Sequence, residues 1–336
     1  MTTDTASRPT HHGSPVHEPP AAIRATAVVV VLTVALAIVA LAFALPAART
    51  APHNVPIGAA GPQAAGGQLT AMLEQQAPGA FTVTYYPGEG ALREAIENRD
   101  VYGGFALTPE GPAALVATGA SPMIAQMLTQ IGGGIAQHTG AELRVEDLAP
   151  PTADDPRGAG LAASALPVTL AGLLPAIALV FALKREVWSR LAAMTVFAGV
   201  AGLSIAALLR WVLGSIDSNF WGVTGALTLG VLATGLTVLG LGSLFGRVGL
   251  ALGSVAAVLV GNPLSGLTSA PELLPSGWGQ FGQFLPQGAN ATLLRSAAFF
   301  DGAGAMVPVA VLTCWVVVGV ALTVTAAVRA RRTAAA

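Results

Sequence analysis

The chain has 336 residues, of which 53% are hydrophobic and only 10% are charged, and its formal net charge is −1. Globular domains usually carry about 25% charged residues, so this composition indicates a protein that lies largely in a lipid bilayer. A near-neutral chain offers no basic stripe for nucleic acid, and we expect no nucleic-acid partner. The single cysteine, Cys314, excludes an intrachain disulfide framework and a cysteine-rich metal site.

The N-terminal region combines a polar tail with an apolar run. Residues 1–22 are polar and rich in proline, and we expect a disordered cytoplasmic tail. The uncharged run that follows predicts a first transmembrane helix over residues 23–46, with its apolar core at 26–45. A cleaved signal peptide is the alternative. Since such peptides have an apolar core of about 7 to 15 residues, the longer run here favours an uncleaved anchor.

Residues 47–160 contain the only segment able to fold in water, and we expect them to be extracytoplasmic. Strand-like runs such as FTVTYY alternate with helical runs such as EGALREAIENRD, which predicts a small α/β domain with a partly parallel sheet. Leu92 and Ile96 fall at i and i+4, as in an amphipathic surface helix, and Val101, Tyr102 and Phe105 then enter the core as a strand. The carboxylates of the domain are scattered, and no catalytic, cofactor or metal site is expected.

Five further apolar runs predict transmembrane helices at about 161–183, 191–213, 222–243, 248–262 and 305–328. The expected fold is therefore a polytopic α-helical membrane protein with six transmembrane helices, in which a small α/β extracytoplasmic domain separates the first helix from a five-helix region at 161–328.

Basic residues in short loops predict the orientation of these helices. The short loop between the second and third runs contains Lys184, Arg185 and Arg190. Arg247 lies in the loop between the fourth and fifth runs, and the C-terminal tail at 329–336 also contains basic residues. These loops, and with them both termini, should be cytoplasmic.

The loop at 263–304 is expected on the outer side. Trp278, Phe281 and Phe284 recur at intervals of three, so their rings share one face of a short helix that lies in the headgroup region or re-enters the bilayer. An amphipathic segment ending at Arg295 should follow. An ordinary interfacial loop is the alternative. The positions in this loop that we single out are Pro271, Glu272, Pro275, Trp278, Pro286 and Arg295.

This arrangement resembles the ABC-2 type transporter permeases and is most similar to the YhgE/Pip ("phage infection protein") branch and its actinobacterial relatives. The outer loop of that family follows the pattern lP…w…lP…lR. Its counterparts here are Leu274-Pro275, Trp278, Leu285-Pro286 and Leu294-Arg295. Residues 91–109 resemble a second conserved region of the family. The resemblance covers most of residues 24–332.

The resemblance implies a permease subunit of an exporter in the bacterial plasma (inner) membrane. Such a subunit moves a hydrophobic or envelope-related substrate outward, works as a homodimer or within a complex, and relies on a separate cytoplasmic ATP-binding subunit. The ATPase-coupling loop would comprise Lys184, Arg185, Glu186, Trp188 and Arg190, for which simple positive-inside anchoring is the alternative.

Two features limit what this chain could do alone. Because Lys184 is its only lysine, it has no P-loop lysine, and we expect it not to be an enzyme. Residues 1–22 also lack the amphipathic helix that many ABC-2 permeases place before the first span. The alternative functions are a non-transporting scaffold or receptor, whose extracytoplasmic domain binds an envelope partner or phage, and an ion-coupled carrier or membrane enzyme.

Overall fold

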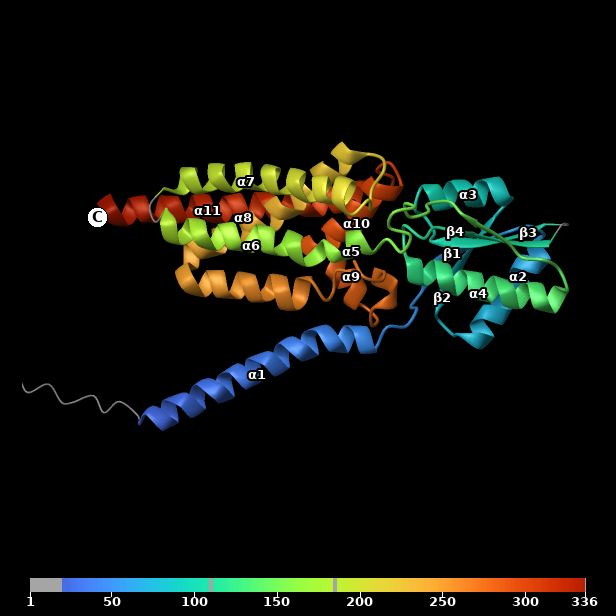
Figure 1. Cartoon of the computed structure of the whole chain (residues 1–336), viewed down its shortest axis with the longest axis horizontal. Helices are drawn as coiled ribbons and strands as arrows, with labels where there is room; N and C mark the ends of the chain where they lie inside the picture. The colour runs from blue at the N-terminus through green and yellow to red at the C-terminus, as the bar shows by residue number, and fades with distance from the viewer. Residues whose placement is uncertain (1–19, 109–110, 184–185, 336) are drawn as a thin grey trace, which may run out of the picture. The chain divides into compact units, whose positions relative to one another are not determined.

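The computed structural model describes residues 20–108, 111–183 and 186–335 of the chain (Figure 1). The chain forms two compact units, Met1–Leu41 and Ala42–Ala336. Most of the expected tail at 1–22, and the basic residues Lys184 and Arg185, lie outside the described residues.

The first helix is α1, Ala21–Ala48. Its apolar side chains are exposed along most of its length, as at Val31 (65%) and Leu36 (69%). A 28-residue helix that is apolar on every side needs an apolar solvent around it. α1 is therefore long and apolar enough to cross a bilayer, as the sequence predicts.

A five-stranded mixed sheet follows, which confirms the expected small domain. Its strands are β1 (Val55–Ala60), β2 (Phe81–Tyr86), β3 (Gly103–Thr108), β4 (Gly111–Val116) and β5 (Arg144–Asp147). The order across the sheet is β2-β1-β3-β4-β5. β1 pairs in parallel with β2 and β3, β3 and β4 are antiparallel, and β4 and β5 are parallel.

Three helices cover the two faces of this sheet. They are α2 (Gln63–Gln76), α3 (Glu89–Glu97) and α4 (Pro122–Thr139). Leu69 and Leu73 of α2 join Ile124 of α4 in the core on one face. α3 lies on the other face (Figure 1). Its Leu92 and Ile96 are fully buried, which confirms the helix expected from their spacing. The central strands are buried on both sides, as in sheets with helices on each face.

Four long apolar helical segments make up most of the rest of the chain. They are α5–α6 (Ala159–Ala163 and Ala165–Ala182), α7 (Val187–Ala207) continued by the π-turn η1 (Leu208–Val212), α8 (Phe220–Val255) continued by η2 (Ala256–Gly261), and α11 (Met306–Ala335). With α1, five helices among the described residues are long and apolar enough to span a membrane. The chain is thus a polytopic helical membrane protein.

The expected fourth and fifth runs, 222–243 and 248–262, appear as one continuous segment of 42 residues, Phe220–Gly261. A straight helix of that length would extend about 63 Å, twice the hydrocarbon thickness of a bilayer. The segment is not straight, because Gly246 has φ 64° and ψ −139°, a conformation that only glycine adopts readily.

The part after Gly246 folds back on the part before it. A Cβ atom added to Gly249 would lie 2.0 Å from the carbonyl oxygen of Leu241, and one added to Gly253 would lie 3.1 Å from a Leu241 methyl. The later arm, orange in Figure 1, therefore packs against the earlier one. The two arms correspond to the two runs expected from the sequence.

Small residues let the long helices approach each other closely. α11 packs on α8, where a Cβ added to Gly319 would lie 2.4 Å from the carbonyl carbon of Leu236. A Cβ added to Gly240 would lie 2.7 Å from the carbonyl oxygen of Gly319. Without these glycines the two backbones could not keep their present separation.

We predict that Gly319→Val lowers the thermal unfolding midpoint of the detergent-solubilised protein, because overpacking of this kind costs about 1–3 kcal/mol. Gly225→Val is the matched control, since an added Cβ there meets no atom within 4 Å. Equal midpoints for the two variants would show that α8 and α11 do not pack through these glycines.

Candidate functional site

The loop at 263–304, called the outer loop after the side on which we expect it, is a series of short helices between the sheet domain and the long helices. It contains η3 (Pro271–Leu273), α9 (Trp278–Gln283) and α10 (Pro286–Phe299). The expected amphipathic segment ending at Arg295 is instead a helix buried on nearly all sides, with 12 of its 14 residues buried, and it continues to Phe299. The expectation of an amphipathic segment was wrong because its polar residues do not form an exposed face. Protein covers both faces of this helix.

Backbone hydrogen bonds and close packing connect this loop to the sheet domain near both of its ends. The backbone N–H groups of Ala51 and His53 donate to the carbonyl oxygens of Leu273 (3.0 Å) and Glu272 (2.9 Å). At the other end of the loop, Phe299 packs so closely on Gly119 that a Cβ added to this glycine would lie 2.5 Å from the ring. α10 also packs against α8 and α11, so one helix contacts both the domain and the bundle.

Arg295 holds the loop in shape from inside. Its side chain is buried, and its Nη2 group donates to the carbonyl oxygens of Gly266 (2.9 Å), Leu267 (2.6 Å) and Ser269 (3.3 Å). Burial lowers the pKa of Arg295 to about 10, which leaves the guanidinium charged at neutral pH. The guanidinium thus supplies a donor to the carbonyl groups of Leu267 and Ser269, whereas the Gly266 carbonyl also accepts from the backbone N–H of Ser269 (3.2 Å).

Arg99 and Tyr102 reach this loop from the end of α3. Arg99, at φ 64°, donates through Nη1 to the carbonyl oxygen of Thr292 (3.0 Å) and to the Ser296 hydroxyl, and its guanidinium carbon lies 5.2 Å from the centroid of the Phe300 ring. The Tyr102 hydroxyl donates to Oε2 of Glu272 at 2.6 Å.

The environment shifts the pKa values of both residues in the direction that burial dictates. Burial, aided by the charge of Glu272, raises the pKa of the Tyr102 hydroxyl, so it stays a neutral donor. Burial lowers the pKa of the Arg99 guanidinium, although the charge of Glu272 acts in the opposite direction.

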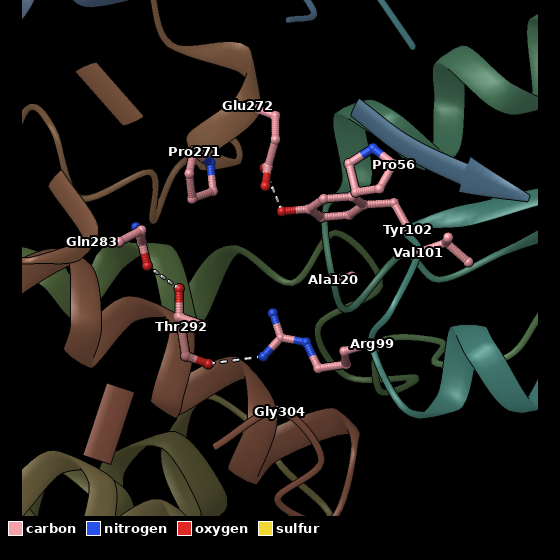
Figure 2. A pocket seen from close by; sticks show the side chains of 10 residues that line it. All are labelled: Pro56, Arg99, Val101, Tyr102, Ala120, Pro271, Glu272, Gln283, Thr292 and Gly304. Carbon is pink, nitrogen blue, oxygen red and sulfur yellow. Dashed lines mark hydrogen bonds between the residues drawn. The ribbon is translucent and has the colours of Figure 1, made fainter. Parts of the chain in front are cut away.

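These side chains border a cavity of about 250 Å³ (Figure 2). Its walls come from the sheet domain and from the outer loop. The lining residues are Pro56, Arg99, Val101, Tyr102, Ala120, Pro271, Glu272, Gln283, Thr292 and Gly304. The Thr292 hydroxyl donates to Oε1 of Gln283 at 2.6 Å, which closes one wall. Both signs of charge therefore face a space large enough for a small molecule.

The six positions singled out in the outer loop have different environments. Pro271 and Glu272 line the cavity, Pro275 is half-buried, and Pro286 is buried as the first residue of α10. Arg295 supports the loop as described above. Trp278 is 37% exposed on α9, and Phe281 and Phe284 are more exposed, at 53% and 67%.

The residues that the sheet domain contributes to the site were not predicted from the sequence. Val101, Tyr102 and Phe105 were expected to enter the core as a strand. Val101 and Phe105 are buried and Tyr102 packs partly buried against the core, but β3 begins only at Gly103 and the Tyr102 hydroxyl reaches Glu272. Arg99 lies two residues after α3 in a left-handed backbone conformation, and its guanidinium reaches α10. An arginine three residues before a tyrosine, between a helix and a strand, was the available signal.

The expected coupling loop is described only from Glu186 onward. Glu186 is exposed and Trp188 is 63% exposed, so both are accessible to a partner or to lipid. Arg190 is buried instead, donating from Nε to the carbonyl oxygen of Leu183 (2.7 Å) and from Nη1 to the Ser243 hydroxyl (2.9 Å). It joins α6, α7 and α8 rather than facing outward.

A second, much smaller cavity of about 10 Å³ lies at the start of α10, against α6 and α8. The Thr169 hydroxyl donates to Oδ1 of Asn262 at 2.7 Å, while Nε2 of Gln287 and Oδ1 of Asn290 have no hydrogen-bond partner among the described residues. A space of this size suits one water molecule, which could accept from Gln287 and donate to Asn290.

Comparison with known proteins adds no relative. No protein family matches the chain, and no curated protein or solved structure shows significant similarity to it. Within the described part of the chain, no group of three or more His, Cys, Asp or Glu residues could hold a metal ion.

We predict that Arg295→Met destabilises the protein by about 3 kcal/mol, because it keeps much of the side-chain volume but leaves buried carbonyl groups without a donor. Thermal unfolding in detergent measures the change. Arg157→Met is the control, since Arg157 is exposed. Arg295 would have no such role if both variants unfolded at the wild-type temperature.

Tyr102→Phe should destabilise the protein in a pH-dependent way. Because the folded protein raises the pKa of Tyr102, the stability that this group contributes is fully present below about pH 10, the value for an unfolded chain, and is lost as the pH rises above it. The difference in unfolding midpoint between wild type and Tyr102→Phe should be constant near neutral pH and shrink above about pH 10. A difference that does not change with pH would contradict the buried hydrogen bond.

Proposed function

We propose that this chain is the membrane permease subunit of an ABC-2-like exporter in the bacterial plasma membrane. It would move a hydrophobic or envelope-related molecule outward, with ATP hydrolysed by a separate cytoplasmic subunit. The observation that carries the proposal is the junction at α10, which contacts α8, α11 and the sheet domain at once. A shift of the long helices would therefore be transmitted to the domain, which a protein using its helices only as an anchor does not need.

The proposal includes a six-span topology in which the two arms of α8 cross the bilayer separately. Both termini are then cytoplasmic, and residues 47–160 lie outside. The tryptophans of the third span support these boundaries. Trp188 and Trp211 are 63% and 70% exposed near opposite ends of α7–η1, about 35 Å apart at 1.5 Å per residue. Exposed tryptophans at that separation suit the two interfaces of a bilayer about 30 Å thick in its core.

The inner ends of the long helices offer a surface for the second subunit. Arg190 fixes α6, α7 and α8 to one another, and Phe245 ends the first arm of α8 with 56% of its side chain exposed. Trp188 is exposed at the same end. An aromatic surface on a rigid support is typical of protein contacts, although a membrane interface also favours such residues.

A non-transporting scaffold or receptor is the second candidate. It is favoured by the apolar packing of α6, α7, α8 and α11, whose buried faces consist mainly of leucine, valine, alanine and glycine. In that case the sheet domain would bind an envelope partner or phage, and the helices would hold it at the surface. Binding of such a partner to the full chain without any ATPase distinguishes this function.

Crosslinked affinity purification from the native membrane, followed by mass spectrometry, tests the first proposal. We predict stoichiometric recovery of a P-loop ATPase with the wild type, and at least a severalfold lower recovery with Trp188→Ala. Trp221→Ala is the matched control, because Trp221 is 74% exposed at the opposite end of the helices.

Two results would contradict these predictions. Recovery of envelope proteins with no ATPase at any crosslinker length would make the scaffold the better account. Equal ATPase recovery with both tryptophan variants would remove Trp188 from the contact surface but leave the permease proposal in place.

A further inference from the structure

The cavity between the sheet domain and the outer loop contains two opposite charges that do not neutralise each other directly. Arg99 and Glu272 both line it, yet they form no ion pair in the described structure. Each is held by a different neighbour, Arg99 by α10 and Glu272 by Tyr102. The space between a fixed cation and a fixed anion is where a bridging ligand would bind.

The hydrogen bonds leave a particular part of each group unused. Nη1 of Arg99 is occupied by Thr292 and Ser296, whereas Nε and Nη2 donate to no acceptor in the part of the chain that the structure describes. These two atoms form the edge of a guanidinium that binds a carboxylate or phosphate with two parallel hydrogen bonds. Oε2 of Glu272 accepts from Tyr102, and Oε1 accepts from no described donor.

We propose that this cavity binds a small zwitterion, a ligand that carries a primary ammonium and a phosphate or carboxylate a few ångströms apart. The anionic group lies on the Nε–Nη2 edge of Arg99, and the ammonium donates to Oε1 of Glu272. Gln283 and Thr292, already bonded to each other, form the wall between them. The inference does not depend on transport or on an ATPase partner.

The charges explain why neither half of such a ligand would suffice. A simple anion would be attracted by Arg99 but would leave Glu272 without a partner. A simple ammonium would pair with Glu272 but be repelled by Arg99 and by the nearby charge of Arg295. The cavity volume of about 250 Å³ accommodates a molecule the size of a phospholipid headgroup.

The shared chemistry has two sources, a soluble zwitterion and the headgroup of a phosphatidylethanolamine. The neighbouring helix is the reason to test the lipid. α9 supplies Gln283 to the cavity and exposes Trp278 and Phe281, residue types that favour a membrane interface.

Calorimetric titration of the full-length protein in detergent tests the proposal with three soluble probes. These are glycerophosphoethanolamine, glycerol phosphate and ethanolamine. We expect the zwitterion to bind at least about tenfold more tightly than either of the others, since each additional charged hydrogen bond is worth about that factor. Equal binding of glycerol phosphate and glycerophosphoethanolamine, or no binding of the zwitterion, would overturn the proposal without any variant.

Two substitutions assign the two halves of the ligand. Glu272→Gln keeps the shape and can still accept from Tyr102, so it should weaken the zwitterion about tenfold without weakening glycerol phosphate. Arg99→Gln should weaken both. Glu97→Gln is the control, because Glu97 is an exposed carboxylate on α3. Zwitterion affinity unchanged in both Glu272→Gln and Arg99→Gln would place the ligand elsewhere.

Native mass spectrometry after reconstitution in equimolar phosphatidylethanolamine and phosphatidylglycerol vesicles then identifies the source. Retention of phosphatidylethanolamine by the wild type, and its loss in Glu272→Gln, would support the proposal with a lipid as ligand. Retention of neither lipid by a protein that binds glycerophosphoethanolamine would support it with a soluble ligand.

Discussion

The structure depends on the need to satisfy polar groups at the point where a folded domain meets apolar helices. Arg295 belongs to a helix, α10, that protein covers on nearly all sides. Its charged guanidinium donates hydrogen bonds to three carbonyl oxygens of the loop. Neither the charge nor the carbonyls could remain unpaired in such surroundings without a large free-energy cost. The loop is therefore fixed to α10, and through Glu272 and Tyr102 it is fixed to the sheet domain.

Hydrogen bonds that satisfy buried polar groups also hold the charged side chains that line the cavity. Because Arg99 and Glu272 are each held by a neighbour, their remaining atoms keep a constant separation and orientation. Such preorganisation allows a small ligand to gain from both charges at little ordering cost. A ligand seated there would touch the domain and the outer loop together, so its binding would strengthen the contact between the domain and the membrane helices.

Much of the fold could be predicted from hydropathy and periodicity alone. The long apolar runs, the helix with Leu92 and Ile96, and the strand FTVTYY all appear where the sequence places them. Local signals are strong in these segments because one solvent, water or lipid, determines each pattern. The sequence of α10, where the sheet domain meets the long helices, follows no such pattern. α10 is polar in sequence yet buried, since its partners come from distant parts of the chain.

The candidate site was predicted on one side only. Glu272 and Arg295 belong to a loop whose prolines and aromatics attract attention, whereas Arg99 and Tyr102 belong to an ordinary turn after a helix. Their roles arise from contacts across 170 to 197 residues, as in Tyr102 to Glu272 and Arg99 to Ser296. No spacing rule on a single sequence detects pairs so far apart.

Distance measurement between two spin labels tests most directly whether the sheet domain and the membrane helices move as one unit. The labels would be placed at Glu97→Cys on α3 and Asp217→Cys before α8, both exposed, in a chain with Cys314→Ser. A single narrow distance distribution in lipid nanodiscs is the predicted result. A broad distribution that is unchanged by Arg295→Met would contradict the account, because it would show a domain tethered to the helices rather than fixed to them.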